Sequence, residues 1–109
     1  MNSIDQRISN GFVRRADHVV WKVVEGKGLL LNLEDGGYFD VDHVGLAVWQ
    51  LCDGKKRSSE IALKISQKFK TDAKRADKDV KSFIGDLRKR KLAEVAPKAN
   101  PAMISRTGK

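Results

Sequence analysis

The sequence lacks the features that would place this chain among secreted or membrane proteins. Its 109 residues include one cysteine, Cys52, which excludes an internal disulfide and fits a reducing compartment. No stretch approaches the roughly 18 consecutive apolar residues that a membrane-spanning helix requires. The first residues also lack the basic patch and apolar segment that mark a secretion signal. These absences predict a cytoplasmic protein that has no membrane partner.

Residue combinations typical of catalysis and of metal binding are also scarce. With only His18 and His43 in the chain, Cys52 has no evident histidine–acid pair to activate it as a nucleophile. Asp40, Asp42 and His43 form a weak metal-ligand set, since no cysteine or second histidine lies nearby in the sequence. No glycine-rich phosphate loop is present. We therefore expect no enzyme activity, no metal and no cofactor.

Basic charge is in excess, and it is unevenly placed. The chain has 22 Lys and Arg against 14 Asp and Glu, a net charge of +8. Residues 53–109 hold 17 of these cations and 7 of the acids, a net of +10, which leaves −2 for residues 1–52. This asymmetry indicates an anionic partner, nucleic acid or acidic peptide, or else lysines that only keep exposed helix faces soluble.

Residues 18–52 carry the strongest structural pattern. Residues 18–24 and 29–33 are apolar or β-branched runs of strand length, and the glycine-containing segment 34–37 suits a turn. A returning strand over 38–41 would complete a three-stranded antiparallel meander, because the connections are too short for crossovers. Asp42 is then placed to cap a helix over about 43–52.

The remaining segments predict two further helices and a compact α+β domain. Ser58 or Ser59 is expected to cap a helix that ends near Phe69, and another helix runs over about 73–91. Residues 12–15 and 92–95 suit short strands, and Trp21 and Trp49 are expected in the core. We predict a loose lead-in at 1–11, one domain at 12–96 and a disordered tail at 97–109. The proportions are winged-helix-like, with a three-stranded antiparallel sheet followed by a three-helix bundle.

Linked segments over roughly residues 18–95 resemble the PqqD-like family, whose stand-alone members are also called RiPP recognition elements. The hairpin Leu-Leu-Asn-Leu-Glu-Asp-Gly-Gly-Tyr-Phe at 30–39 is similar to the family's hairpin, and Gly45 to Trp49 to its first helix. Val41-Asp42 departs from the Leu-Asn that many relatives have before this helix. The other matching positions are Asp53-Gly54, Ser58 to Ile61, Asp79-Val80, Phe83, Leu87 and Leu92.

The resemblance implies a non-enzymatic peptide chaperone. In this family the leader of a ribosomally made precursor lies as an added strand beside the third strand, and its side chains enter a groove between that strand and the third helix. The module presents the precursor to a modifying enzyme, such as a radical-SAM protein or a peptidase.

The residues themselves are compatible with that function. A third strand at 37–41 would be a sheet edge, whose unpaired N–H and C=O groups a peptide can complete. Lys81, Arg88 and Lys91 could attract an acidic leader, and Asp79 could meet a basic or hydroxyl group. Alternation leaves open which of Tyr38 and Phe39 faces the groove. The candidate peptide-binding residues are Gly37, Tyr38, Phe39, Asp40, Val41, Asp79, Val80, Phe83, Ile84 and Leu87.

Two alternatives stay open. One is a nucleic-acid-binding winged helix. The sequence pI near 9.8 and the basic run at 88–91 support this alternative. Against it, the sheet precedes the helices, and cations are favoured at a helix C-terminus in any case. The other is an assembly module that binds an enzyme surface rather than a peptide. The chain could be a monomer, or a dimer through its open sheet edges.

Overall fold

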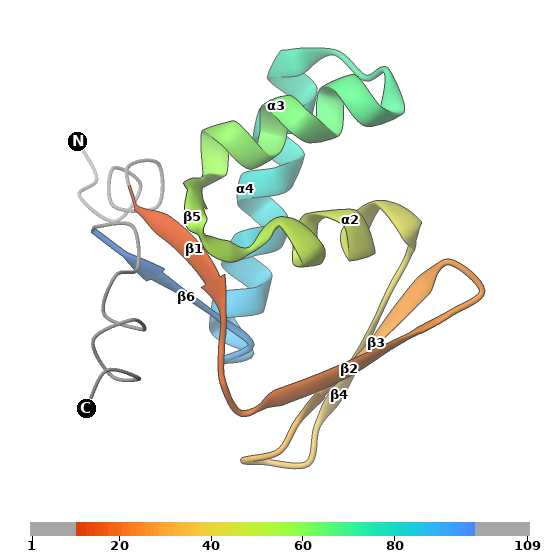
Figure 1. Ribbon diagram of the computed structural model, residues 1–109, viewed down its shortest axis with the longest axis vertical. Helices are drawn as coiled ribbons and strands as arrows, with labels where there is room; N and C mark the ends of the chain where they lie inside the picture. Colours follow the sequence, from red (N-terminus) through yellow and green to blue (C-terminus); the bar gives the residue numbers. More distant parts are fainter. Residues whose placement is uncertain (1–10, 98–109) are drawn as a thin grey trace.

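The computed structural model describes residues 11–97, which form two small antiparallel sheets and three helices (Figure 1). The predicted lead-in and tail lie outside these residues, except for Gly11 and Pro97. The elements in chain order are β1 (Phe12–Arg15), β2 (Val19–Val24), β3 (Lys27–Asn32), β4 (Tyr38–Val41), α2 (His43–Leu51), β5 (Asp53–Arg57), α3 (Ser58–Phe69), α4 (Ala73–Lys89) and β6 (Ala93–Ala96).

The predicted meander is confirmed as the sheet β2-β3-β4, in which β2 and β4 are the edges. Its register places Leu30 opposite both Trp21 and Phe39. Gly28, Leu30 and Asn32 of β3 are buried on the face toward the helices, as strand alternation requires. In Figure 1 the helices lie to one side of this sheet, so its inner face contributes to the core and its outer face does not.

The second sheet, β5-β1-β6, was predicted only in part. The short strands near 12–15 and 92–95 are confirmed as β1 and β6, which pair through four residues on each side. No strand was predicted over residues 53–57. They form β5, which pairs irregularly with β1, and Gly54 in it has a φ of +83°.

The helices begin at or near the predicted residues. Asp42 caps α2, since its Oδ1 accepts a hydrogen bond of 2.8 Å from the Gly45 amide. The capping residue of α3 is Arg57 rather than Ser58 or Ser59, and its amide donates to Glu60 Oε1 at 2.7 Å. Among the described residues, no helix is long and apolar enough to cross a membrane.

The core lies where the meander, the helices and β1 meet. Trp49 is fully buried, as predicted. Trp21 is 37% exposed and meets Trp49 edge-on, with 6.2 Å between ring centroids, so the prediction that it belongs to the core is wrong. The reason is that β2 is an edge strand, and β3 contacts the helices more closely than β2 does. The predicted α+β class is confirmed, although the winged-helix likeness is loose.

Candidate functional site

The open edge of β4 is the first component of the site. The Asn32 amide donates to the Gly37 carbonyl at 2.8 Å, which fixes the pairing pattern between β3 and β4. Because hydrogen-bonded and non-bonded pairs alternate in an antiparallel ladder, Phe39 and Val41 direct their backbone groups toward β3. Tyr38 and Asp40 therefore direct their N–H and C=O groups toward the open edge. A peptide strand could pair with these two residues.

Phe39 is the aromatic residue of β4 that faces α4. Its ring stacks on Phe83 with 6.2 Å between centroids and 25° between planes, and the Arg90 guanidinium lies 4.0 Å from the Phe39 ring centroid. Tyr38 is 70% exposed on the opposite face of the sheet. Of the two residues, Phe39 therefore faces the expected groove and Tyr38 does not.

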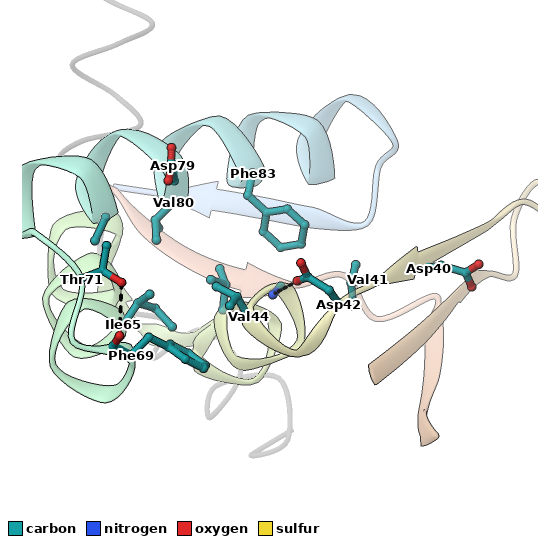
Figure 2. A pocket seen from close by; sticks show the side chains of 13 residues that line it. Asp40, Val41, Asp42, Val44, Ile65, Phe69, Thr71, Asp79, Val80 and Phe83 are labelled. Carbon is teal, nitrogen blue, oxygen red and sulfur yellow. Dashed lines mark hydrogen bonds between the residues drawn. The ribbon is translucent and has the colours of Figure 1, made fainter. Parts of the chain in front are cut away.

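A cavity of about 370 Å³ opens beside the end of β4, between α2, α3 and α4. Figure 2 shows Phe83 and Val80 reaching into it from α4, opposite Val44 of α2, with Ile65 and Phe69 on the side of α3. The lining is mostly apolar, which suits an apolar side chain of a ligand. It consists of Asp40, Val41, Asp42, Val44, Gly45, Val48, Ile65, Phe69, Thr71, Ala76, Asp79, Val80 and Phe83.

A second hollow of about 120 Å³ lies at the other end of β4. Gly37, Tyr38 and Phe39 border it from the strand, and Arg90 borders it from the end of α4. Asp40 and Val41 border the larger cavity instead. The two hollows therefore follow one another along β4, and a strand paired there could place side chains in both.

The charge around the larger cavity is opposite to that of the whole chain. Three acidic residues, Asp40, Asp42 and Asp79, are among its lining residues, and none of the described lining residues is basic. The Asp40 side chain points away from the cavity (Figure 2). Asp79 lies 3.7 Å from the Arg75 side chain in an exposed ion pair, which weakens its charge little. Lys81, expected to attract an acidic leader, pairs with Asp77 at 2.9 Å instead.

Hydrogen bonds join the end of α4 to the meander. Asn32 is 3% exposed, and its Nδ2 donates to the Arg90 carbonyl at 3.2 Å. The Asn32 Oδ1 accepts from the Glu34 amide at 2.8 Å. His18 Nε2 lies 2.8 Å from the Lys91 carbonyl. Asn32 of β3 and His18, just before β2, thus contact carbonyls that follow the C-terminal end of α4.

The predicted site residues fall into two groups. Those on β4 lie at the open edge, and Asp79, Val80 and Phe83 line the larger cavity. Ile84 and Leu87 have no exposed surface, because they lie on the side of α4 that packs into the core. This placement removes both residues from the groove lining that the sequence predicted.

Several lining residues were not named from the sequence. Val44, Ile65 and Phe69 belong to the predicted apolar stripes of the first two helices, but periodicity cannot show which members of a stripe remain uncovered. Arg90 belongs to the basic run that was assigned to the helix end. Its position against Phe39 depends on contacts between residues far apart in the sequence.

Two residues of the weak metal-ligand set Asp40, Asp42 and His43 make other contacts in the structure. Asp42 is engaged as the α2 cap, and His43 packs edge-on against Phe69 with 5.6 Å between centroids. Within residues 11–97, no three His, Cys, Asp or Glu side chains lie close enough together to hold a metal ion.

Residues 27–93 match the family model for coenzyme PQQ synthesis protein D, PqqD. The chain belongs to this family. The matched segment contains β3, β4, all three helices and the start of β6, and hence both sides of the groove. The family resemblance drawn from the sequence is thereby confirmed. No curated protein sequence gives a significant match.

Solved structures of three proteins are similar to this PqqD-family chain. TbiB1, in complex with the TbiA(beta) leader peptide, is 31% identical with a TM-score of 0.68, covering 74% of this chain and 94% of TbiB1. The PqqD truncation of Methylobacterium extorquens PqqCD, a stand-alone RiPP recognition element, is 27% identical with a TM-score of 0.63, covering 75% of this chain and 87% of its own.

A lasso peptide synthetase B1 complexed with its leader peptide shares the fold at 18% identity, with a TM-score of 0.65 and coverage of 76% and 98%. Nothing among these matches supports the nucleic-acid alternative.

Proposed function

We propose that this chain binds the leader segment of a ribosomally synthesised precursor peptide by strand addition along β4. The observation that carries the proposal is the open edge of β4, which lies directly beside two hollows in a PqqD-family fold. Backbone pairing with Tyr38 and Asp40 would supply affinity that does not depend on sequence. Side chains of the leader that enter the hollows would supply specificity.

The lining predicts which leader side chains fit. A leader residue that points inward beside Val41 meets the larger cavity, where Val80 and Phe83 offer apolar contacts. We propose an apolar anchor at this position, because buried apolar anchors dominate the binding energy of most interfaces. A basic or hydroxyl-bearing neighbour would suit the carboxylate of Asp79 at the rim.

We also propose that the chain performs no chemistry itself and presents the bound precursor to a modifying enzyme, such as a radical-SAM protein or a peptidase. Support comes from the family and from the larger cavity, which is lined mainly by apolar residues rather than by a nucleophile–base pair. Cys52 is free and buried, which fits the reducing cytoplasm as the proposed location.

Calorimetric titration of the full chain tests this function. Synthetic leader peptides encoded beside the gene are the ligands, and a short DNA duplex is the comparison. We expect one saturable peptide site whose affinity changes little with salt. DNA binding that falls steeply with salt, without any peptide binding, would contradict the proposal.

A matched pair of variants locates the groove. Phe83→Ala removes the ring that lines the larger cavity and stacks on Phe39, so we expect leader affinity to fall by about tenfold or more. Ser82→Ala changes an exposed neighbour on the same helix that borders neither hollow, and it should bind as the unaltered chain does. Circular dichroism confirms that both variants are folded. Unchanged affinity in folded Phe83→Ala would place the peptide elsewhere.

A further inference from the structure

The face of the meander that points away from the helices carries apolar side chains on all three strands. We call it the outer face, and its register forms two rows that cross the sheet. One row is entirely apolar or aromatic, and the other has a leucine between two opposite charges. The rows are Val20–Leu31–Tyr38 and Lys22–Leu29–Asp40, with Val24 beyond them on β2.

The outer face is exposed in the single chain. Val20 is 47%, Val24 49% and Tyr38 70% exposed, and no described element packs over them (Figure 1). Large apolar side chains that lie together on a sheet surface mark an interaction site more often than scattered ones do. Within residues 11–97, no further strand pairs with either edge of this sheet.

We propose that the outer face binds the outer face of a second copy of this chain, about a two-fold axis parallel to the strands. The charges select this partner and this axis. Lys22 on β2 and Asp40 on β4 occupy opposite ends of one row, with Leu29 between them. Rotation about such an axis stacks β2 of each copy over β4 of its partner. Each Lys22 then meets the partner's Asp40, so that two ion pairs form.

The same rotation matches the apolar row with itself. Val20 of each copy meets the partner's Tyr38, and Leu31 meets the partner's Leu31 at the axis. Strand directions remain aligned, which is a common way for two sheets to pack face to face. A two-fold axis across the strands would instead stack each Lys22 over Lys22 of the other copy or over an apolar side chain. Charge complementarity therefore favours the first arrangement.

The dimer leaves the leader edge unobstructed. The interface uses the outward side chains of β2, β3 and β4, whereas strand addition uses the backbone edge of β4 and the opposite face. The proposal does not depend on leader binding. Three short strands bury less surface than the roughly 800 Å² per partner of a standard interface, so association should be concentration-dependent.

Sedimentation equilibrium of the full chain tests the proposal over about 10 µM to 1 mM, the range of a weak interface. We expect a reversible monomer–dimer equilibrium at low salt. Lys22→Asp and Asp40→Lys each bring like charges together at both symmetric contacts, so each should weaken dimerisation at least about tenfold. Lys64→Asp makes the same charge change on an exposed position of α3 and should leave the equilibrium unchanged.

Two rescues complete the test. The double variant Lys22→Asp/Asp40→Lys restores opposite charges at both contacts, and so does an equimolar mixture of the two single variants. Both should dimerise nearly as well as the unaltered chain. A chain that stays monomeric throughout this concentration range would overturn the proposal. The outer face would then be a candidate binding surface for a different protein. The proposal would also be overturned if the single substitutions left the dimer dissociation constant unchanged, or if neither rescue restored dimerisation.

Discussion

Phe39 is the residue at which the meander and α4 meet. Its ring stacks on Phe83, and Arg90 covers it from the end of the helix. Aromatic pairs and cation–π contacts each add roughly 0.5–1.5 kcal/mol of stabilisation beyond the burial of surface. These contacts therefore hold Phe39 in its position. Because it stays in place, the hollows on either side of it exist before a peptide arrives. Such a preformed site lowers the cost of ordering on binding.

Cys52 gives a prediction at the same scale. Burial raises the pKa of its thiol from 9.0 to about 12, and the Sγ donates to the Val48 carbonyl at 3.2 Å. The thiolate is the reactive form, so at pH 8 the folded chain should react with a disulfide reagent at least about 100-fold more slowly than the urea-unfolded chain. Similar rates in the two states would show that the thiol is accessible.

The same shift has a consequence for stability. The unfolded chain loses its thiol proton near pH 9.0, while the folded chain keeps the proton until about pH 12. The contribution of Cys52 to stability is therefore fully present below pH 9.0 and falls as the pH rises above it.

At the scale of elements, the close approach of β3, β4 and α2 decides whether the groove forms. A Cβ on Gly28 of β3 would lie 2.7 Å from Val41 Cγ2 and 3.0 Å from Leu46 Cδ1. These are side chains of β4 and α2, and both are buried. The position therefore requires glycine for space rather than for backbone conformation.

Two glycine variants test this packing. Gly28→Ala should lower the free energy of unfolding by about 1–3 kcal/mol, because it overpacks a closed interface. Gly85 lies within α4 with open space around its Cα, so Gly85→Ala should raise the free energy of unfolding by about 0.5–1 kcal/mol. Urea unfolding monitored by circular dichroism measures both. Equal effects of the two changes would contradict the packing described here.

The elements that the sequence predicts well are those with local signals. The turn at 34–37, the Asp42 cap and the apolar stripes of the helices all reside in neighbouring residues. β5 gives no such signal, because Asp53-Gly54-Lys55-Lys56-Arg57 has neither alternation nor β-branched residues. It is a strand because β1, some 40 residues earlier, is available to pair with it.

The groove was predictable in outline and not in its lining. The family resemblance placed the third strand and the third helix on opposite sides of it, and Val80 and Phe83 were among the residues expected to line it. Ile84 and Leu87 occur in the same periodic pattern, yet the direction of α4 against the core buries them. The end of α4 is also joined to the meander by the Asn32 bond to the Arg90 carbonyl, a contact over 58 positions that no local pattern indicates.

At the scale of the whole molecule, charge and surface are divided among separate regions. The chain carries a net +8, but the larger cavity beside β4 is bordered by carboxylates alone among its charged lining residues. The net charge therefore does not describe the proposed binding site. The meander offers two surfaces with different proposed uses: the edge of β4 for the leader and the outer face for a second copy.

The two edges of the meander make the central claim testable by hydrogen exchange of the full chain with and without leader peptide. On β2, the Leu33 amide donates to the His18 carbonyl at 2.9 Å, and alternation then directs the amides of Trp21 and Val23 toward the open edge. We predict that leader binding slows exchange at the amides of Tyr38 and Asp40 at least about tenfold and leaves those of Trp21 and Val23 unchanged. Slowed exchange at Trp21 and Val23 alone, or no change at Tyr38 and Asp40 while the peptide is bound, would contradict strand addition along β4.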